Sequence, residues 1–194
     1  MKKVILIALF TIMSVLLVAC NNDSDKNHTK APDDTMIIQQ SKFSEETQEV
    51  LQIINNEIAF FDYETNETIK SMSIAVWTYK DGQWINSGGT HGDINPGKKR
   101  IAIRLNENSG DIFEINETGY TKYTYDNIVD FSQCTMQGSF RLTNPTNIEI
   151  NKEITLWVNL GTSKNALSSS ENFREVDCDA GVAMTITFSD KNID

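Results

Sequence analysis

Hydrophobic and polar residues change their spacing twice along this chain. An apolar run from Val4 to Val18 follows Lys2 and Lys3 at the very start. Around residues 44–55 the apolar positions recur at helical intervals, and beyond them apolar and polar residues alternate. The three patterns predict an export segment, one short helix and a series of β-strands.

The helix is expected to run from Ser44 to about Asn55. Ser44 can cap the first turn, where two glutamates follow and the helix dipole favours anions. The apolar positions at helical spacing are Val50, Leu51, Ile54 and Ile58. We expect this stripe to pack against the domain; a partner-binding helix is the alternative.

Alternation with a period of two predicts strands with one buried and one wet face. Apolar positions assigned to single faces are Ile101, Ile103 and Leu105; Ile150, Ile154, Leu156, Val158 and Leu160; and Val182, Met184, Ile186 and Phe188. Turns are expected at Asp81-Gly82, Asn108-Ser109-Gly110 and Glu117-Thr118-Gly119. Long helical crossovers are lacking, so the fold class predicted is mainly β: an antiparallel β-sandwich of about eight or nine strands with one N-terminal helix.

The apolar run closes on Leu17-Val18-Ala19-Cys20, which resembles the lipobox of bacterial lipoproteins. That resemblance implies a diacylglyceryl group on the Cys20 sulfur, cleavage before Cys20 by signal peptidase II, and a place on the outer face of the cell membrane, expected in a Gram-positive bacterium. The run is also shorter than the roughly 20 residues that span a bilayer as a helix. We therefore expect a signal peptide over 1–19, a lipidated flexible tether over 20–35 and a single β-sandwich-like domain over 36–194.

The net charge indicates how the chain is attached to the membrane. The chain has a formal net charge of −10, and its longest basic run is Lys98-Lys99-Arg100. Nucleic acids and anionic membranes are bound through clusters of Lys and Arg, so neither is an expected partner of the domain itself. The lipid on Cys20 would then be the sole membrane contact, with two acyl chains for stable anchoring.

Two further cysteines, Cys134 and Cys178, lie in the predicted domain. Outside the cytoplasm a disulfide between them is permitted. Two small buried thiols are the alternative.

Catalytic and metal-binding patterns are scarce. The chain has two histidines, and it contains no Gly-x-Ser-x-Gly elbow, no GxGxxG and no phosphate-binding loop. The sequence therefore predicts no enzyme and no cofactor. Glu175, Asp177 and Asp179 alternate, so a strand would place them on one face as a weak candidate Ca²⁺ site, with a solvated strand face or loop as the alternative.

Aromatic residues give the hint of binding. Flat exposed rings can stack on sugars or anchor a protein partner. The candidate ligand contacts are Trp84, Tyr120, Tyr123, Tyr125 and Trp157. Tyr123 and Tyr125 would share a strand face and Trp157 would lie on the polar face of its strand; packing in the core is the alternative for all of them.

These patterns favour an extracytoplasmic binding or interaction module with a protein or glycan partner. One alternative is an envelope hydrolase that uses two carboxyl groups, which would require a concave pocket and a raised carboxyl pKa. Another is a Ca²⁺-dependent adhesin or solute-binding component.

Overall fold

The computed structural model describes most of the chain beyond residue 34, and these residues belong to one compact unit. The described ranges are 35–54, 58–105, 109–126, 129–168, 170 and 172–193. The predicted signal peptide, Cys20 and nearly all of the predicted tether lie outside them.

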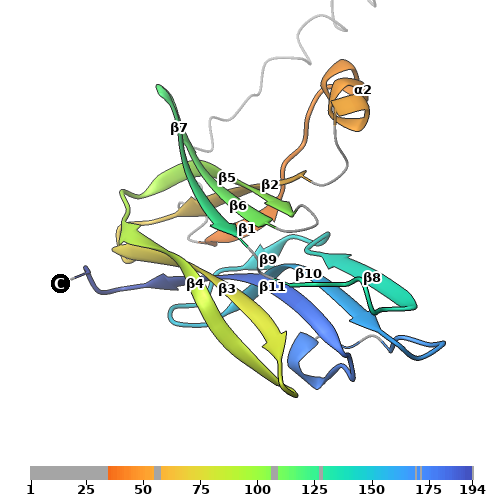
Figure 1. The fold of residues 1–194 in the computed structure, drawn as a ribbon. Coiled ribbons are helices and arrows are strands. Elements are labelled where there is room, and N and C mark those ends of the chain that lie inside the picture. Colours follow the sequence, from red (N-terminus) through yellow and green to blue (C-terminus); the bar gives the residue numbers. More distant parts are fainter. Residues whose placement is uncertain are drawn as a thin grey trace, which may run out of the picture. The chain divides into compact units, whose positions relative to one another are not determined.

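Two antiparallel sheets make up the unit, one above the other in Figure 1. The first, sheet A, has the order β7-β6-β5-β2-β1-β9, with bounds Gly119–Asp126, Ser109–Asn116, Gly97–Leu105, Ile58–Thr65, Ile37–Gln40 and Thr146–Asn147. The second, sheet B, has the order β4-β3-β11-β10-β8, with bounds Gln83–Asp93, Ser71–Lys80, Ala180–Ser189, Ile154–Thr162 and Met136–Arg141.

Apolar side chains from both sheets meet in one buried cluster. Sheet A contributes residues such as Phe61 and Ile103, and sheet B contributes residues such as Met184, all with no exposed surface. The rings of Tyr63 and Phe188 join the layers at 5.2 Å between centroids. The predicted antiparallel sandwich is therefore confirmed, and most of its stability comes from this shared apolar interior.

The described residues form eleven strands, more than the eight or nine expected. The excess includes β1 and β9, which are four and two residues long and too short to show alternation. Asp81 and Gly82 turn β3 into β4 with φ of 53° and 82°, as a type I′ hairpin requires. The turn before Gly119 is also confirmed, whereas Ser109 and Gly110 already belong to β6 and not to a turn.

A β-bulge in β10 overturns the expected assignment of its faces. The pairing with β11 shifts register between Thr155 and Trp157. Leu156 and Trp157 both enter the central cluster, and Val158 and Leu160 turn to the opposite face. An extra residue in one strand reverses the side-chain alternation beyond it, which the sequence pattern did not reveal. Ile150, expected on the same face, precedes β10 in a turn and is 41% exposed.

The predicted helix is α2, Glu45–Ile54. Ser44 caps it as expected, since its hydroxyl accepts a hydrogen bond from the Thr47 amide at 3.4 Å. Of the expected apolar stripe, Val50 is 51% exposed, Leu51 is half-buried and Ile58 lies in β2, whereas the Ile54 side chain is outside the described residues. No helix among the described residues is both long and apolar enough to cross a bilayer.

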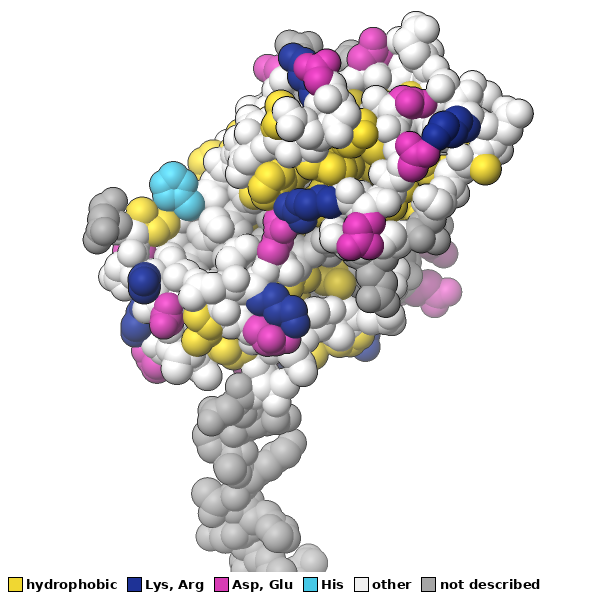
Figure 2. Space-filling view, turned by 90° about the horizontal axis from the view of Figure 1, so that it is seen from below, with side chains coloured by type: hydrophobic (Ala, Val, Ile, Leu, Met, Phe, Trp, Pro, Cys, Tyr) yellow, Lys and Arg dark blue, Asp and Glu magenta, His cyan; other side chains and the backbone are white. Residues whose placement is uncertain are grey.

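The described residues of 163–179 cover part of the outer face of sheet B. Their 3₁₀ turn η1, Phe173–Glu175, places Phe173 in a second buried cluster with Val158, Leu160 and Cys178. Figure 2 views the molecule from below and shows hydrophobic side chains gathered here, with charged side chains between them. No described loop covers the outer face of sheet A in this way, although Phe43 packs against Phe60 on it.

Candidate functional site

The outward-facing residues of β2, β5, β6 and β7 form a continuous surface, which we call the outer face of sheet A. Phe61, Ile101 and Ile112 point into the core, so the residues that alternate with them point away from it. The outer face comprises Ile58, Phe60, Asp62, Glu64, Lys98, Arg100, Ala102, Arg104, Ser109, Asp111, Phe113, Ile115, Tyr120, Lys122, Thr124 and Asp126.

Two aromatic pairs lie on this surface. Phe43, in the segment before α2, meets Phe60 edge to face at 5.2 Å between centroids. Phe113 of β6 meets Tyr120 of β7 in the same manner at 5.6 Å. Tyr120 is 66% exposed, so one face of this pair is open to a ligand.

Three cations lie over these rings. The Arg100 guanidinium is 4.9 Å from the centroid of Phe43, the Arg104 guanidinium 5.6 Å from that of Phe113, and the Lys122 ammonium 5.9 Å from the same ring. Such contacts place a positive charge beside an apolar floor. The surface can therefore offer apolar and cationic contacts to the same ligand.

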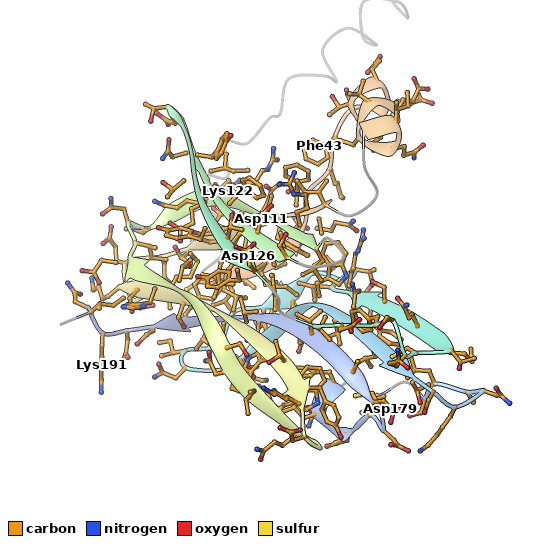
Figure 3. The ribbon with its side chains drawn as sticks, viewed as in Figure 1. Phe43, Asp111, Lys122, Asp126, Asp179 and Lys191 are labelled. Carbon is orange, nitrogen blue, oxygen red and sulfur yellow. The ribbon has the colours of Figure 1, made fainter. Side chains whose placement is uncertain are left out.

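Asp111 is the charged group that organises this end of the face. It is 1% exposed and forms ion pairs with Arg104 and, at 3.1 Å, with Lys122 (Figure 3). The Thr124 hydroxyl donates at 2.7 Å to Oδ1, the oxygen atom that Lys122 also contacts, whereas Arg104 contacts Oδ2. Burial acts to raise the pKa of Asp111, but the hydrogen bonds from Thr124, Arg104 and Lys122 outweigh it and hold the pKa below its ordinary value. Two cations thus share the carboxylate of Asp111, and a second carboxylate, Asp126, lies on the same face of β7.

Asp62 of β2 also holds a cation in place on the outer face of sheet A. Arg100 donates to both of its oxygen atoms, at 2.6 and 3.0 Å, and the Ser41 hydroxyl donates at 2.9 Å. Burial acts to raise the pKa of Asp62, yet these hydrogen bonds lower it on balance. The same pair raises the pKa of Arg100, so this cation stays charged.

An open groove of about 900 Å³ continues the outer face toward the turn between β6 and β7. Its lining includes Ile37 and Ile115 as apolar residues, Lys98 and Arg100 as cations, and Glu117. The groove is large enough for an extended peptide segment or a few sugar rings.

The structure separates the three predicted tyrosines. Tyr120 is exposed on the outer face, whereas Tyr123 and Tyr125 pair with Ile112 and Gly110 and share the opposite strand face, as expected. Tyr123 is 37% exposed, and the half-buried ring of Tyr125 packs where a side chain on Gly88 would lie. Tyr120 is therefore the predicted contact that belongs to the candidate site.

Neither predicted tryptophan is presented to a ligand. Trp157 is 2% exposed, because the bulge turns it inward, and its Nε1 donates to Ser139 at 2.8 Å and to Asn159 at 2.9 Å. Trp84 is half-buried, and its ring packs against Phe173 at 4.6 Å and against Gly181. Both side chains pack against other residues of the domain, so the structure corrects their prediction as ligand contacts.

The carboxylates expected on one strand face lie in η1 and the loop before β11. Glu175 accepts a hydrogen bond from the Asn172 side chain at 3.0 Å, and Asp177 pairs with Lys164. Asp179 accepts from the Ser163 amide, which lowers its pKa. Each carboxylate stabilises a different part of the loop, and no group of three potential ligand side chains in the described ranges could hold a metal ion. The prediction that these three carboxylates share one strand face is therefore wrong.

Cys134 and Cys178 are free thiols and not the disulfide considered from the sequence. Cys134 lies against Gly161, where its sulfur fills the space of the missing Cβ. Cys178 is buried in the cluster under η1. Burial, with the negative charges of Asp177 and Asp179, raises the pKa of the Cys178 thiol to about 11, so it is a poor nucleophile at neutral pH.

A second groove, of about 720 Å³, is lined by four carboxylate residues: Asp81, Asp126, Asp130 and Asp179. The Ser132 amide lowers the pKa of Asp130, and the Ser163 amide lowers that of Asp179. A hydrolase general acid needs a raised pKa, and every resolved carboxyl shift among the described residues is a lowering. The groove therefore gives no support to hydrolysis by a carboxyl pair.

Sequence reasoning missed most of the outer face. It assigned Ile101, Ile103 and Leu105 to one face of a strand but did not show that Asp111 and Phe113 come to lie beside the residues of its other face. Cross-strand neighbours depend on register, which no single strand encodes.

Comparison with known proteins gives one match. A family model described as the YgaN domain matches residues 37–180, from the start of β1 to the first residue of β11, and so includes all of sheet A. No curated protein and no solved structure matches the chain.

Proposed function

The chain belongs to the YgaN domain family, and for this member we propose the function of a lipid-anchored interaction protein on the outer face of the bacterial cell membrane. A diacylglyceryl group on Cys20 holds the chain to the membrane, and the outer face of sheet A binds a protein or glycan partner. The anchor rests on Leu17-Val18-Ala19-Cys20, and the binding surface rests on the geometry of the folded unit.

The observation that carries the proposal is the open aromatic and cationic floor of sheet A. The described residues of loop 163–179 cover part of the outer face of sheet B, whereas Phe113, Tyr120 and Lys122 lie on a face that has no equivalent cover among the described residues. Exposed aromatic residues beside Arg are the side chains most enriched where proteins bind partners. A structural role alone does not require an aromatic ring that is 66% exposed.

Site-specific photocrosslinking in intact cells tests the proposal. A benzophenone amino acid replaces Tyr120 in the full-length chain, a change that conserves an exposed aromatic side chain. The matched control places the same probe at His91, an exposed residue of β4 whose pairing with Ser73 puts it on the outer face of sheet B. We expect an adduct of increased mass from Tyr120 and little or none from His91. Equal yields at both sites, or no adduct from Tyr120, would refute a binding role for this face.

A further inference from the structure

Helix α2 is too short to be stable without a surface to pack against. It spans ten residues, and isolated helices below about 12–15 residues are marginal in water. Val50 is 51% and Ile53 is 85% exposed, and neither belongs to a buried cluster, whereas Leu51 is half-buried. Val50 and Ile53 therefore lack the cover that the apolar side of an amphipathic helix requires.

The charges of α2 restrict what that cover can be. The helix carries Glu45, Glu46 and Glu49 and has no Lys or Arg. Glu45, Glu49 and Ile53 follow each other at intervals of four, so acidic and apolar side chains share one edge of the helix. A matching surface must be apolar and must carry positive charge along one side.

The outer face of sheet A has this chemistry. Phe113 and Tyr120 supply an apolar floor, and Arg104 and Lys122 lie beside it and share the carboxylate of Asp111. Figure 3 shows Phe43 near the base of α2, with Lys122 and Asp111 on the sheet.

We propose that α2 of one copy lies across the outer face of sheet A of a second copy, and that the second copy returns the same contact. The inference rests on the proposed function and names the protein partner of its binding face. Phe43 is held between Phe60 and Arg100, which fixes where α2 leaves its own sheet. A reciprocal exchange buries both helices in one closed two-fold assembly and leaves no further free site.

Crosslinking between two differently tagged full-length copies tests this directly. One copy carries Ile53→Cys on α2 and the other carries Tyr120→Cys on the outer face of sheet A. A short bismaleimide is added to intact cells that express both. Both positions are exposed, so neither change removes a buried contact. Gln52→Cys, on the opposite side of α2, is the matched control.

The expected result is an adduct that contains both tags, with Ile53→Cys giving about tenfold more of it than Gln52→Cys. Burial of an Ile side chain is worth enough for about a tenfold change in association, so Ile53→Ser should weaken recovery of the dimer to a similar degree. Equal yields at the two helix positions would overturn the inference.

The remaining outcomes distinguish a failure of this inference from a failure of the proposed function. In a further variant that carries Ile53→Cys and Tyr120→Cys in the same chain, a crosslink within that chain and none between copies would mean that α2 closes on its own sheet. Protection of Ile53→Cys from a water-soluble maleimide, with no adduct between copies, would mean that α2 lies in the lipid surface. Either result overturns the second copy as occupant. If a probe at Tyr120 still captures a different molecule, the binding face stands and its proposed partner is wrong; if nothing is captured, both proposals fail.

Discussion

Asp111 shows how one buried carboxylate can organise a surface. It anchors Arg104 and Lys122 over the ring of Phe113 while being almost inaccessible to water. A buried charge is tolerated because all of its neighbours here are hydrogen-bond donors. The arrangement keeps two long cationic side chains in place on an otherwise apolar floor.

We expect Asp111→Asn to lower the free energy of unfolding by about 1–3 kcal/mol at neutral pH, because it removes charge-assisted hydrogen bonds from a buried site. The folded-state pKa of Asp111 is lowered, so its stabilisation is complete above the unfolded pKa of about 3.9 and is lost as pH falls through the folded value. Urea unfolding as a function of pH measures this. The difference between the two proteins should shrink below about pH 4.

Asp126→Asn is the matched control, since Asp126 is an exposed carboxylate of β7. It should change stability by no more than about 0.5 kcal/mol. Similar losses in both variants would show that Asp111 has no special role.

Gly89 gives a second test at single-residue scale. A Cβ at this position would lie 2.1 Å from the carbonyl oxygen of Ile74, which is backbone and cannot rotate away. Gly89→Ala should therefore destabilise the protein by about 3 kcal/mol or more. Gly92→Ala, in the same strand with nothing within 4 Å of its Cβ, should stay within about 0.5 kcal/mol of the parent. Thermal or urea unfolding of the two variants measures these changes. If both substitutions left the stability unchanged, the close pairing of β4 with β3 would be contradicted.

At the scale of elements, alternation in the sequence predicted the strands around Ile101 and Val182 and the hairpin at Asp81-Gly82. It failed at β10, where one bulge between Thr155 and Trp157 exchanged the two faces. It also failed for the segment around Asp177, because loop carboxylates can alternate without belonging to a strand. Local spacing encodes local backbone shape, whereas bulges and strand neighbours depend on contacts that only the folded chain makes.

Loop 163–179 is held on sheet B through Arg174. Its guanidinium lies 4.3 Å from the ring centroids of Trp77 and Phe173 and pairs with Glu153 at 2.8 Å. Arg174→Ala should cost about 1–2 kcal/mol, through loss of both packing and charge. Urea unfolding followed by tryptophan fluorescence would detect the change.

Lys164→Ala is the matched control for that loop. Lys164 pairs with Asp177, but both side chains are more than 60% exposed, so the pair is screened by water. We expect at most about 0.5 kcal/mol from its loss. An equal effect of both substitutions would mean that Arg174 acts as one more surface charge and does not hold the loop.

At the scale of the whole molecule, the outer faces of the two sheets differ in how far they are covered. A loop covers part of the outer face of sheet B, whereas the outer face of sheet A carries rings and cations that are open to contact. The sandwich could be predicted from the sequence, and Tyr120 was the one predicted contact that fell on the open face. The rest of that face required the register of four strands.

Attachment to the membrane is the claim on which the whole proposal depends, because it places the binding face outside the cell. Mass spectrometry of the chain purified from bacterial membranes tests it most directly. We expect a mature chain that begins at Cys20 with a diacylglyceryl group on its sulfur, and we expect Cys20→Ser to remain unprocessed and without lipid. A chain that keeps residues 1–19, or that begins elsewhere without lipid, would contradict the account.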